Sequence, residues 1–526
     1  MSSRPIDVEE ARALIHGSGE VAFLDVREAA DYGEGHPLFA VPCAYGDLEA
    51  EAVRLVPSRR VTVILLGEGG PDDVAQRAAR RLVALGYSDV RPLAGGAPAW
   101  AAAGHPLYAG VNVPSKTLGE LLEHERHPRT LAPETLAAWQ AAGRSFHFFD
   151  VRPPAEYAKM RVPGATCAPN GELAHRFDAL VPDPTTPVVL TCAGRTRGLV
   201  GALGLALAEV PNPVFALENG TQGWALAGLP LERGAQAAPL PPLSPEALAA
   251  SRRRADAIIA RHRLVEIDAA TASRLRRDAA RTTYAFDLRD EDAALAVPVS
   301  GAEPALAGQL VQASDLFMGV RRARVILVDD AGLRAATSAV WLAMMGFEPL
   351  LLRLAASAER VDLASVFAPT GPARPSGLSA EAALALAAEP CTAVIDLRSS
   401  EARDGCAVAG ATWIRRAALP GSLPAGTRRA LLLVPDAGMA ARAALDLREA
   451  GIEAAHLVFD RAAMERAGWR LDPAPEPLPR EAARDRVWFV HDRHDGNREA
   501  SLRYLAWETG LVAQLDAAER SAFRLG

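Results

Sequence analysis

The sequence predicts an α/β protein of four tandem domains, each an open, mostly parallel sheet flanked by helices. The first observation behind this prediction is an apolar strand that ends in Asp-aliphatic-Arg and occurs four times. Its copies read FLDVRE, FFDVRP, AFDLRD and VIDLRS, with the acidic residue at Asp25, Asp150, Asp287 and Asp396. Successive aspartates are separated by the length of a typical domain, which is too long for a solenoid repeat.

A second apolar strand follows each copy, and this is the second observation. The runs lie at 61–66, 187–191, 325–328 and 430–434. Their nearly continuous apolar character favours parallel strands that are covered on both faces. An Ala-rich amphipathic helix is predicted after each run, near 74–86, 199–207, 335–345 and 440–450. Because three of these helices lead into a further strand, we expect the right-handed crossovers of an open α/β sheet.

The domain boundaries are predicted from length and from Pro-rich segments. A chain of 526 residues is too long for one hydrophobic core. The segments 235–242 and 368–375 are rich in proline and are interpreted as semi-rigid linkers. We therefore expect domains at 1–110, 111–235, 243–368 and 376–474. A polar, partly helical tail at 475–526 is not assigned to a fifth domain.

Composition excludes several classes of function. The net charge is −7 and charges of both signs are interspersed, so nucleic acid is not expected as a partner. The five cysteines form no CxxC pair, which argues against a zinc site or a disulfide framework. The N-terminal residues lack an apolar signal region, and no apolar run reaches about 18 residues. We expect a cytoplasmic protein without cofactor, bound metal or membrane contact.

The chemistry is predicted at one loop, which lies between the strand at 187–191 and the helix after it. It consists of Cys192, Ala193, Gly194, Arg195, Thr196, Arg197 and Gly198. Ligand sites of open α/β sheets form at such strand ends. Backbone N–H groups, the helix N-terminus and two guanidinium groups all stabilise a thiolate, so a lowered pKa of Cys192 is expected. The same N–H groups can hold an anion or the outer sulfur of a persulfide. The alternative is an inert buried cysteine.

The second copy resembles the rhodanese family, whose active-site cysteine opens a six-residue loop after a central strand. The loop from Cys192 to Arg197 is similar to a known variant of that loop. The flanking segments also match: Asp150-Val151-Arg152, Glu156-Tyr157 and Pro163-Gly164-Ala165 upstream, and Asn219-Gly220-Thr221-Gln222-Gly223-Trp224 downstream. One departure is Met160-Arg161, where the family usually has Gly-His. With the tail segment Tyr504-Leu505-Ala506-Trp507-Glu508, the whole chain resembles multidomain rhodanese-related sulfurtransferases of bacteria.

This resemblance implies a sulfurtransferase. Cys192 would take sulfane sulfur from an anionic donor as a persulfide and pass it to a small thiol, a protein thiol or cyanide. Residues 193–198 would bind substrate, while Asp150 and Arg152 would support the loop. Arg195 and Arg197 would either orient the donor or pin the loop to carboxylates. Two loop arginines favour thiosulfate over mercaptopyruvate as the donor.

Two other functions stay open: a persulfide carrier or sensor, and an interaction scaffold, each acting with protein donors and acceptors. A Cys-dependent phosphatase is disfavoured, because its arginine would fall at Gly198. The other three copies have Gly67, Asp329 and Pro435 at the position of Cys192 and are expected to be inactive packing or docking domains. Arg334 alone preserves the last loop arginine. Cys167 would be either a small strand residue or a resolving thiol.

Overall fold

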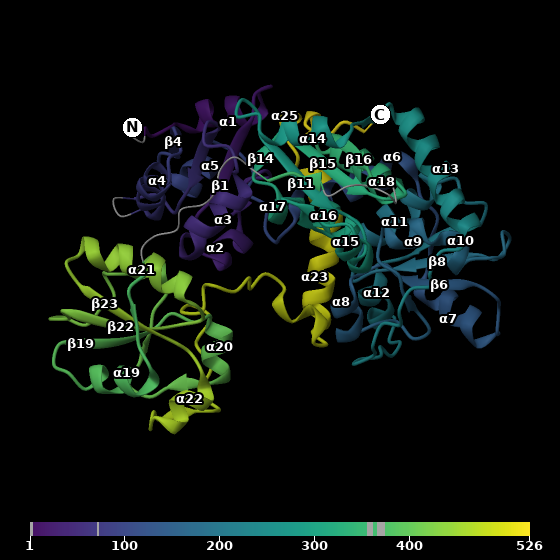
Figure 1. Ribbon diagram of the computed structural model, residues 1–526. Helices are drawn as coiled ribbons and strands as arrows, with labels where there is room; N and C mark the ends of the chain where they lie inside the picture. Colours follow the sequence, from purple (N-terminus) through teal and green to yellow (C-terminus); the bar gives the residue numbers. More distant parts are fainter. Residues whose placement is uncertain (1–3, 71–72, 355–360, 365–373, 526) are drawn as a thin grey trace.

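The computed structural model describes residues 4–70, 73–354, 361–364 and 374–525. Most of the predicted linker at 368–375 lies outside these residues. Four five-stranded sheets follow one another along the chain, and helices flank each of them (Figure 1). This confirms the predicted α/β class and the tandem arrangement. No helix in the part of the chain that the structure describes combines the length and apolar character needed to cross a membrane.

The first sheet is parallel except at one edge. Its central strand β1 pairs with β3 on one side, and on the other side with β2 and with β14 of the third copy. The pairing of β1 with β14 is antiparallel and joins two domains in one sheet. The strands are β1 (Val21–Asp25), β2 (Val41–Pro42), β3 (Thr62–Leu66), β4 (Asp89–Pro92) and β14 (Val320–Arg321). The helices are α1 (Val8–His16), α2 (Ala29–Glu34), η1 (Tyr45–Asp47), α3 (Leu48–Leu55), α4 (Val74–Ala84) and α5 (Gly96–Ala102).

The second sheet has the strand order β5-β9-β8-β6-β7 and is parallel throughout. Its middle strand β8 is buried along its whole length. The strands are β5 (Thr130–Leu131), β6 (His147–Asp150), β7 (Thr166–Cys167), β8 (Val188–Thr191) and β9 (Val214–Leu217). The helices are α6 (Val113–Arg126), α7 (Pro133–Ala141), α8 (Pro154–Lys159), α9 (Glu172–His175), α10 (Phe177–Leu180), α11 (Thr196–Leu207) and α12 (Gly220–Leu226).

The third sheet repeats this order as β10-β16-β15-β11-β13. Its strands, with the small pair β12 and β17, are β10 (Val265–Glu266), β11 (Thr283–Asp287), β12 (Val299–Ser300), β13 (Glu303–Pro304), β15 (Arg324–Asp329), β16 (Glu348–Arg353) and β17 (Val361–Asp362). The helices are α13 (Pro245–His262), α14 (Ala269–Arg276), α15 (Glu291–Ala296), α16 (Ala307–Gln312), α17 (Ser314–Phe317) and α18 (Leu333–Met344).

The fourth sheet has the same order again, β18-β23-β22-β19-β21. Its strands, with the small pair β20 and β24, are β18 (Ser376–Gly377), β19 (Thr392–Asp396), β20 (Ala407–Val408), β21 (Thr412–Trp413), β22 (Arg429–Val434), β23 (Glu453–Val458) and β24 (Leu471–Asp472). The helices are α19 (Ala380–Ala387), α20 (Ser400–Gly405), η2 (Arg416–Ala418), α21 (Ala437–Glu449) and α22 (Arg461–Arg466).

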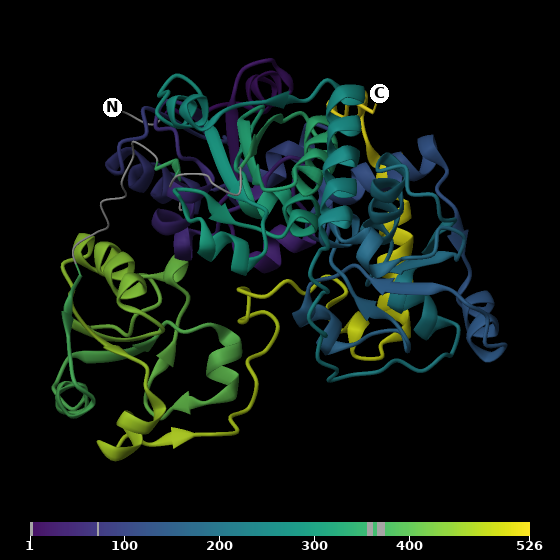
Figure 2. The same ribbon diagram turned by 45° about the vertical axis from the view of Figure 1, so that its right-hand side comes forward.

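The tail after the fourth sheet returns to the second domain. It forms η3 (His491–His494), α23 (Arg498–Thr509), α24 (Leu511–Gln514) and α25 (Ala517–Ser521). Figure 2 shows α23 running alongside the second domain. The chain then continues to the first domain, where Arg12 pairs with Asp516 at 2.6 Å and Tyr108 donates to Glu519 at 2.6 Å.

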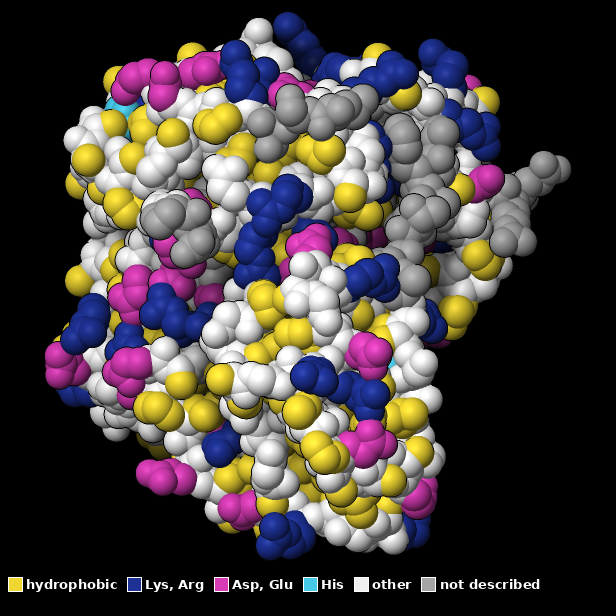
Figure 3. All heavy atoms as spheres, turned by 90° about the vertical axis from the view of Figure 1, so that its left-hand side faces the viewer, with side chains coloured by type: hydrophobic (Ala, Val, Ile, Leu, Met, Phe, Trp, Pro, Cys, Tyr) yellow, Lys and Arg dark blue, Asp and Glu magenta, His cyan; other side chains and the backbone are white. Residues whose placement is uncertain are grey.

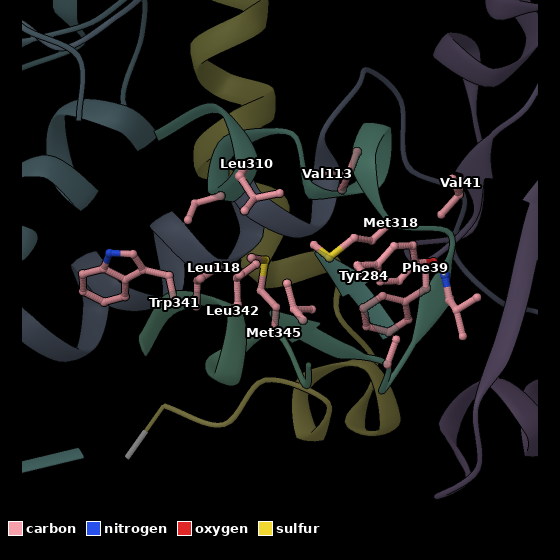
Figure 4. Packing of buried hydrophobic residues seen from close by; sticks show 14 of the residues in the cluster. Phe39, Val41, Val113, Leu118, Tyr284, Leu310, Met318, Trp341, Leu342 and Met345 are labelled. Atoms are coloured by element: carbon pink, nitrogen blue, oxygen red, sulfur yellow. Dashed lines mark hydrogen bonds between the residues drawn. The ribbon is translucent and has the colours of Figure 1, made fainter. Parts of the chain in front are cut away.

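One hydrophobic core runs through the first three domains and the tail. Its buried members include Phe39 of the first domain, Leu118 of α6, and Leu310 and Trp341 of the third domain (Figure 4). The fourth domain has separate cores on the two faces of its sheet and stands apart from the main body in Figure 1. On the outer face shown in Figure 3, acidic and basic side chains lie interspersed.

A buried charge cluster docks the fourth domain onto the first. Arg416 donates to Glu49 at 2.5 and 2.7 Å and to Asp446 at 2.8 Å, and all three side chains are almost fully buried. Arg81 and Tyr45 also donate to Asp446. Three buried charges in mutual contact make this interface intolerant of the loss of one partner.

We predict that Arg416→Met weakens the docking of the fourth domain by roughly 3–5 kcal/mol, because the buried Glu49 loses its two hydrogen bonds from Arg416, while Asp446 keeps Arg77 and Arg81. Denaturant unfolding followed by limited proteolysis should then show an early transition that releases residues 376–474. Arg461→Met, at an exposed ion pair of the same domain, should leave unfolding unchanged. An unaltered transition in Arg416→Met would show that the cluster does not hold the two domains together.

Candidate active site

The predicted loop lies at the carboxyl end of the central strand of the second sheet. Cys192 follows β8 directly, and α11 begins at Thr196. The structure therefore brings residues 192–198 together at the N-terminus of a twelve-residue helix. Cys192 is only 2% exposed. Its sulfur accepts hydrogen bonds from the backbone N–H groups of Gly194 and Gly198, which provide the anion cradle predicted at this position.

The predicted lowering of the Cys192 pKa is wrong. Burial raises the pKa of the thiol above its ordinary value, although Arg197 and the two N–H groups oppose that shift. Desolvation disfavours the charged form of any thiol, and here it outweighs the cradle. Arg197 and the N–H groups of Gly194 and Gly198 therefore compensate only part of the cost of burying a thiolate.

The start of α12 holds the loop from behind. Thr221 N–H donates to the carbonyl of Cys192 at 2.8 Å, and Gln222 donates to the carbonyl of Ala193 from both its backbone and its side chain at 3.2 Å. Gly220 has φ +52°, and a Cβ at this position would lie 2.2 Å from the carbonyl oxygen of Cys192. The backbones of Gly220 and Cys192 meet so closely that only glycine fits at position 220. This explains the glycine in the segment Asn219–Trp224.

The two loop arginines are both engaged with carboxylates. Arg195 donates to Glu120 at 2.8 and 3.2 Å and contacts Glu123 as well. Arg197 forms a bidentate pair with Glu156, at 2.6 and 2.7 Å. Burial raises the pKa of Glu120 to about 7, although Arg195 opposes that shift. Of the two roles considered for these arginines, the geometry therefore corresponds to pinning of the loop.

The second and third domains each provide an acceptor for a loop arginine of the other. Gln309 of α16 accepts from Arg197 at 3.1 Å, while Glu172 of α9 accepts from Arg334 of the third domain at 2.7 Å. Gln309 and Glu172 occupy the same position when each is counted from the aspartate of its own copy. The second and third domains thus face each other with an approximate twofold relation, and the active copy receives the neutral side chain.

In the three copies without the cysteine, an aspartate carboxylate accepts from backbone N–H groups at or near the start of the corresponding helix. Asp329 accepts from Ala335 N–H at 3.1 Å, just as Cys192 accepts from Gly198, six positions later in both copies. Asp73 accepts from the N–H groups of Gly69 and Ala75, and Asp436 from those of Gly438 and Met439. Burial raises the pKa of Asp329, but Arg334 and the surrounding hydrogen bonds hold it below its ordinary value. The corresponding place in α11 is taken by the Cys192 sulfur.

Asp150 and Arg152 lie beneath the loop and pair with each other. Arg152 Nε donates to Asp150 at 2.9 Å and Nη2 to the carbonyl of Met160 at 2.5 Å. The same Nε–carboxylate distance of 2.9 Å recurs in the other three copies, as does a bond to the carbonyl eight residues further on. The pair is thus a repeated element of the fold.

Cys167 is buried with its thiol directed to the carbonyl of Arg152, and burial raises its pKa to about 11.

Helix α23 of the tail covers the loop at Gly194. The sequence did not predict this contact. Tyr504 and Glu508 of α23 approach Gly194 so closely that a Cβ there would lie 2.9 and 3.1 Å from them. Lys116 of α6 lies under the rings of Tyr504 and Trp507 and is fully enclosed, which lowers its pKa to about 8. The segment Tyr504–Glu508 is recognisable in the sequence as part of the resemblance. Its spacing, however, does not indicate that it packs on the loop at 192–198, which is distant in the sequence.

A cleft of about 190 Å³ lies beside the tail and reaches Thr221 and Gln222, which hold the loop. Three arginines line it: Arg233, Arg493 and Arg498. Each donates to a backbone carbonyl, and none forms an ion pair within the described chain. Uncompensated positive charge therefore lies at this cleft and not at the loop arginines.

Comparisons with known proteins agree with this architecture. A model of the rhodanese-like domain matches residues 7–103 and 132–227. The crystal structure of a thiosulfate sulfurtransferase from Pseudomonas aeruginosa is 35% identical, with a TM-score of 0.90 over 99% of this chain and 99% of that chain. A rhodanese-like domain from Anabaena sp. is 27% identical and aligns with 20% of this chain and 80% of that chain, with a TM-score of 0.19. A comparison with curated proteins finds no match.

The full-length likeness covers all four sheets, and the family model matches the two N-terminal copies. The chain therefore belongs to the rhodanese family and is built from four rhodanese-like domains.

Proposed function

We propose that the chain is a sulfurtransferase in which Cys192 carries sulfane sulfur as a persulfide from an anionic donor, with thiosulfate favoured, to a thiol or cyanide acceptor. The observation that supports this most is the cradle at the start of α11. It holds a sulfur atom where the third copy holds a permanent carboxylate through the equivalent N–H group. A site that accommodates an anion in one copy is suited to a thiolate or persulfide anion in another.

In the first half-reaction the Cys192 thiolate attacks the outer sulfur of thiosulfate. A bond forms between the two sulfur atoms, the sulfur–sulfur bond of thiosulfate breaks, and sulfite leaves with the electron pair. The N–H groups of Gly194 and Gly198 disperse the negative charge on the resulting persulfide. Arg197 adds a positive charge that favours the thiolate, while its pair with Glu156 keeps the loop in place.

Charge at the cleft beside the tail supports an anionic donor. Arg233, Arg493 and Arg498 have no carboxylate partner within the described chain, so they can attract an anion to the edge of the site. The Pseudomonas aeruginosa protein, 35% identical over its full length, is named a thiosulfate sulfurtransferase. That name supports thiosulfate as the donor here.

Enclosure of the site favours small acceptors over protein thiols. Cys192 is covered by α12 behind, by α23 above and by the third domain beside Arg197. A protein partner would have to displace α23 before its cysteine reached the sulfur. A small thiol or cyanide needs far less room than a protein partner.

We predict that thiosulfate adds one sulfur atom to the intact wild-type protein and none to Cys192→Ser, because the other cysteines lack the cradle. Intact-mass spectrometry after removal of excess donor makes the measurement. Cys167→Ser, which removes a buried thiol already directed to a carbonyl, is the matched control and should retain the gain. A gain that persists in Cys192→Ser would assign the sulfur to another cysteine.

We also predict that Arg197→Gln shifts the reactivity of Cys192 to higher pH. In the wild type, the rate of alkylation by iodoacetamide should still be rising above the usual thiol pKa of about 8.5, because burial raises the pKa of Cys192. Removal of the Arg197 charge raises that pKa further, so the rate at neutral pH falls. Peptide mass spectrometry across a pH series measures both curves, with the exposed Arg144→Gln as control. A curve that moves to lower pH would contradict the assigned role of Arg197.

A further inference from the structure

A buried carboxylate from the tail points into the active site. Glu508 is 1% exposed. Its Oε1 accepts from the Thr196 hydroxyl at 2.7 Å, whereas its Oε2 has no hydrogen-bond partner among the described residues. That free oxygen lies 3.1 Å from the position a Cβ would take on Gly194. An unpartnered buried carboxylate oxygen is costly to keep, and this one faces the loop that holds the reactive sulfur.

Charged groups from every neighbouring element surround Glu508. Those that interact with it are Lys116 and Glu120 of α6, Cys192 and Arg195 of the loop, and Tyr504 of its own helix. Arg493 of η3 lies over the Tyr504 ring at 4.7 Å. Two cations, Lys116 and Arg195, and two groups that can carry a negative charge, Glu120 and Cys192, therefore lie around this carboxylate.

The proposed second half-reaction needs a group of this kind. A thiol with an ordinary pKa of about 8.5 is mostly protonated at neutral pH, and only its thiolate attacks a persulfide. The site excludes most solvent, so water is a poor proton acceptor there. The carboxylate oxygens of Glu156 and Glu120 that approach the loop are bound to arginines. The free Oε2 of Glu508 is not.

We propose that Glu508 is the general base of sulfur transfer to a thiol acceptor, a role that rests on the proposed function of Cys192. The free Oε2 takes the proton of the acceptor thiol as the thiol sulfur attacks the outer sulfur of the Cys192 persulfide, which has taken up a proton from solvent after sulfite left. A bond forms between the acceptor sulfur and the outer sulfur, and the bond from that sulfur to Sγ breaks. The electron pair stays on Sγ as a thiolate in the N–H cradle, the product leaves as a persulfide, and Glu508 returns its proton to solvent.

The same carboxylate opposes an anionic acceptor. Sulfite needs no proton removal when it attacks the persulfide, and its charge is repelled by Glu508. Replacement of Glu508 by glutamine should therefore act in opposite directions on the two acceptors. A merely structural role would slow both.

The test uses the full-length protein loaded with sulfur from thiosulfate and freed of donor, with loading verified by intact mass. Single-turnover loss of the persulfide is followed with 2-mercaptoethanol and, separately, with sulfite. We expect Glu508→Gln, which keeps the acceptor for Thr196, to slow transfer to 2-mercaptoethanol at pH 7 by roughly 10²-fold. Transfer to sulfite should be unchanged or faster. Glu499→Gln, an exposed carboxylate on the same helix, should leave both rates unchanged.

Equal slowing with both acceptors, or no slowing with the thiol, would overturn the role of Glu508. If Glu508→Gln fails to load, the pH profile of the wild type decides. Transfer that rises with pH more weakly than the thiolate fraction of 2-mercaptoethanol supports a general base, and transfer that follows that fraction tenfold per pH unit excludes it. Failure of the wild type itself to load would instead contradict the proposed function of Cys192.

Discussion

In the proposed reaction, a sulfur anion at Cys192 has to be held where almost no water reaches, and the rest of the site depends on this requirement. Burial alone disfavours the thiolate. Two N–H groups and the charge of Arg197 work against that cost, and each of them requires further structure. The N–H groups require the tight loop, the loop requires the close contact with Gly220, and Arg197 requires Glu156 to keep it in position.

In the three other copies, an aspartate carboxylate accepts hydrogen bonds from the N–H groups at or near the helix start. Asp73, Asp329 and Asp436 each place a carboxylate at the helix start that follows their sheet strand. Each aspartate satisfies N–H groups at its helix N-terminus and places a negative charge there, which opposes the binding of a substrate anion. In the function that we propose, these domains are scaffold: the first shares a sheet with the third, the third contributes Gln309 beside Arg197, and the fourth docks through Arg416. The chain after the fourth domain contributes α23, so a tail that is remote from Cys192 in the sequence closes the site.

Much of the fold could be predicted from sequence because it depends on local signals. The strand ending in Asp-aliphatic-Arg marks a pair that forms with the same geometry in all four copies, and buried runs such as 187–191 identify the central strands. The loop from Cys192 to Gly198 was found for the same reason, since strand, loop and helix are contiguous. The direction of the Cys192 pKa shift was predicted wrongly because it depends on burial, and burial follows from the packing of distant segments around the loop. The partners Glu120, Glu156 and Glu508 carry no spacing that connects them to the loop, and the pairing of β1 with β14 joins strands from the first and third copies.

The most direct test of this account is a crystal structure of the protein after sulfur loading. We predict one additional sulfur atom on Cys192, enclosed by the backbone N–H groups of the loop, with α23 still seated above it and Glu508 facing it. A loaded structure with the sulfur on another cysteine, or with α23 displaced so that the persulfide is open to solvent, would contradict it.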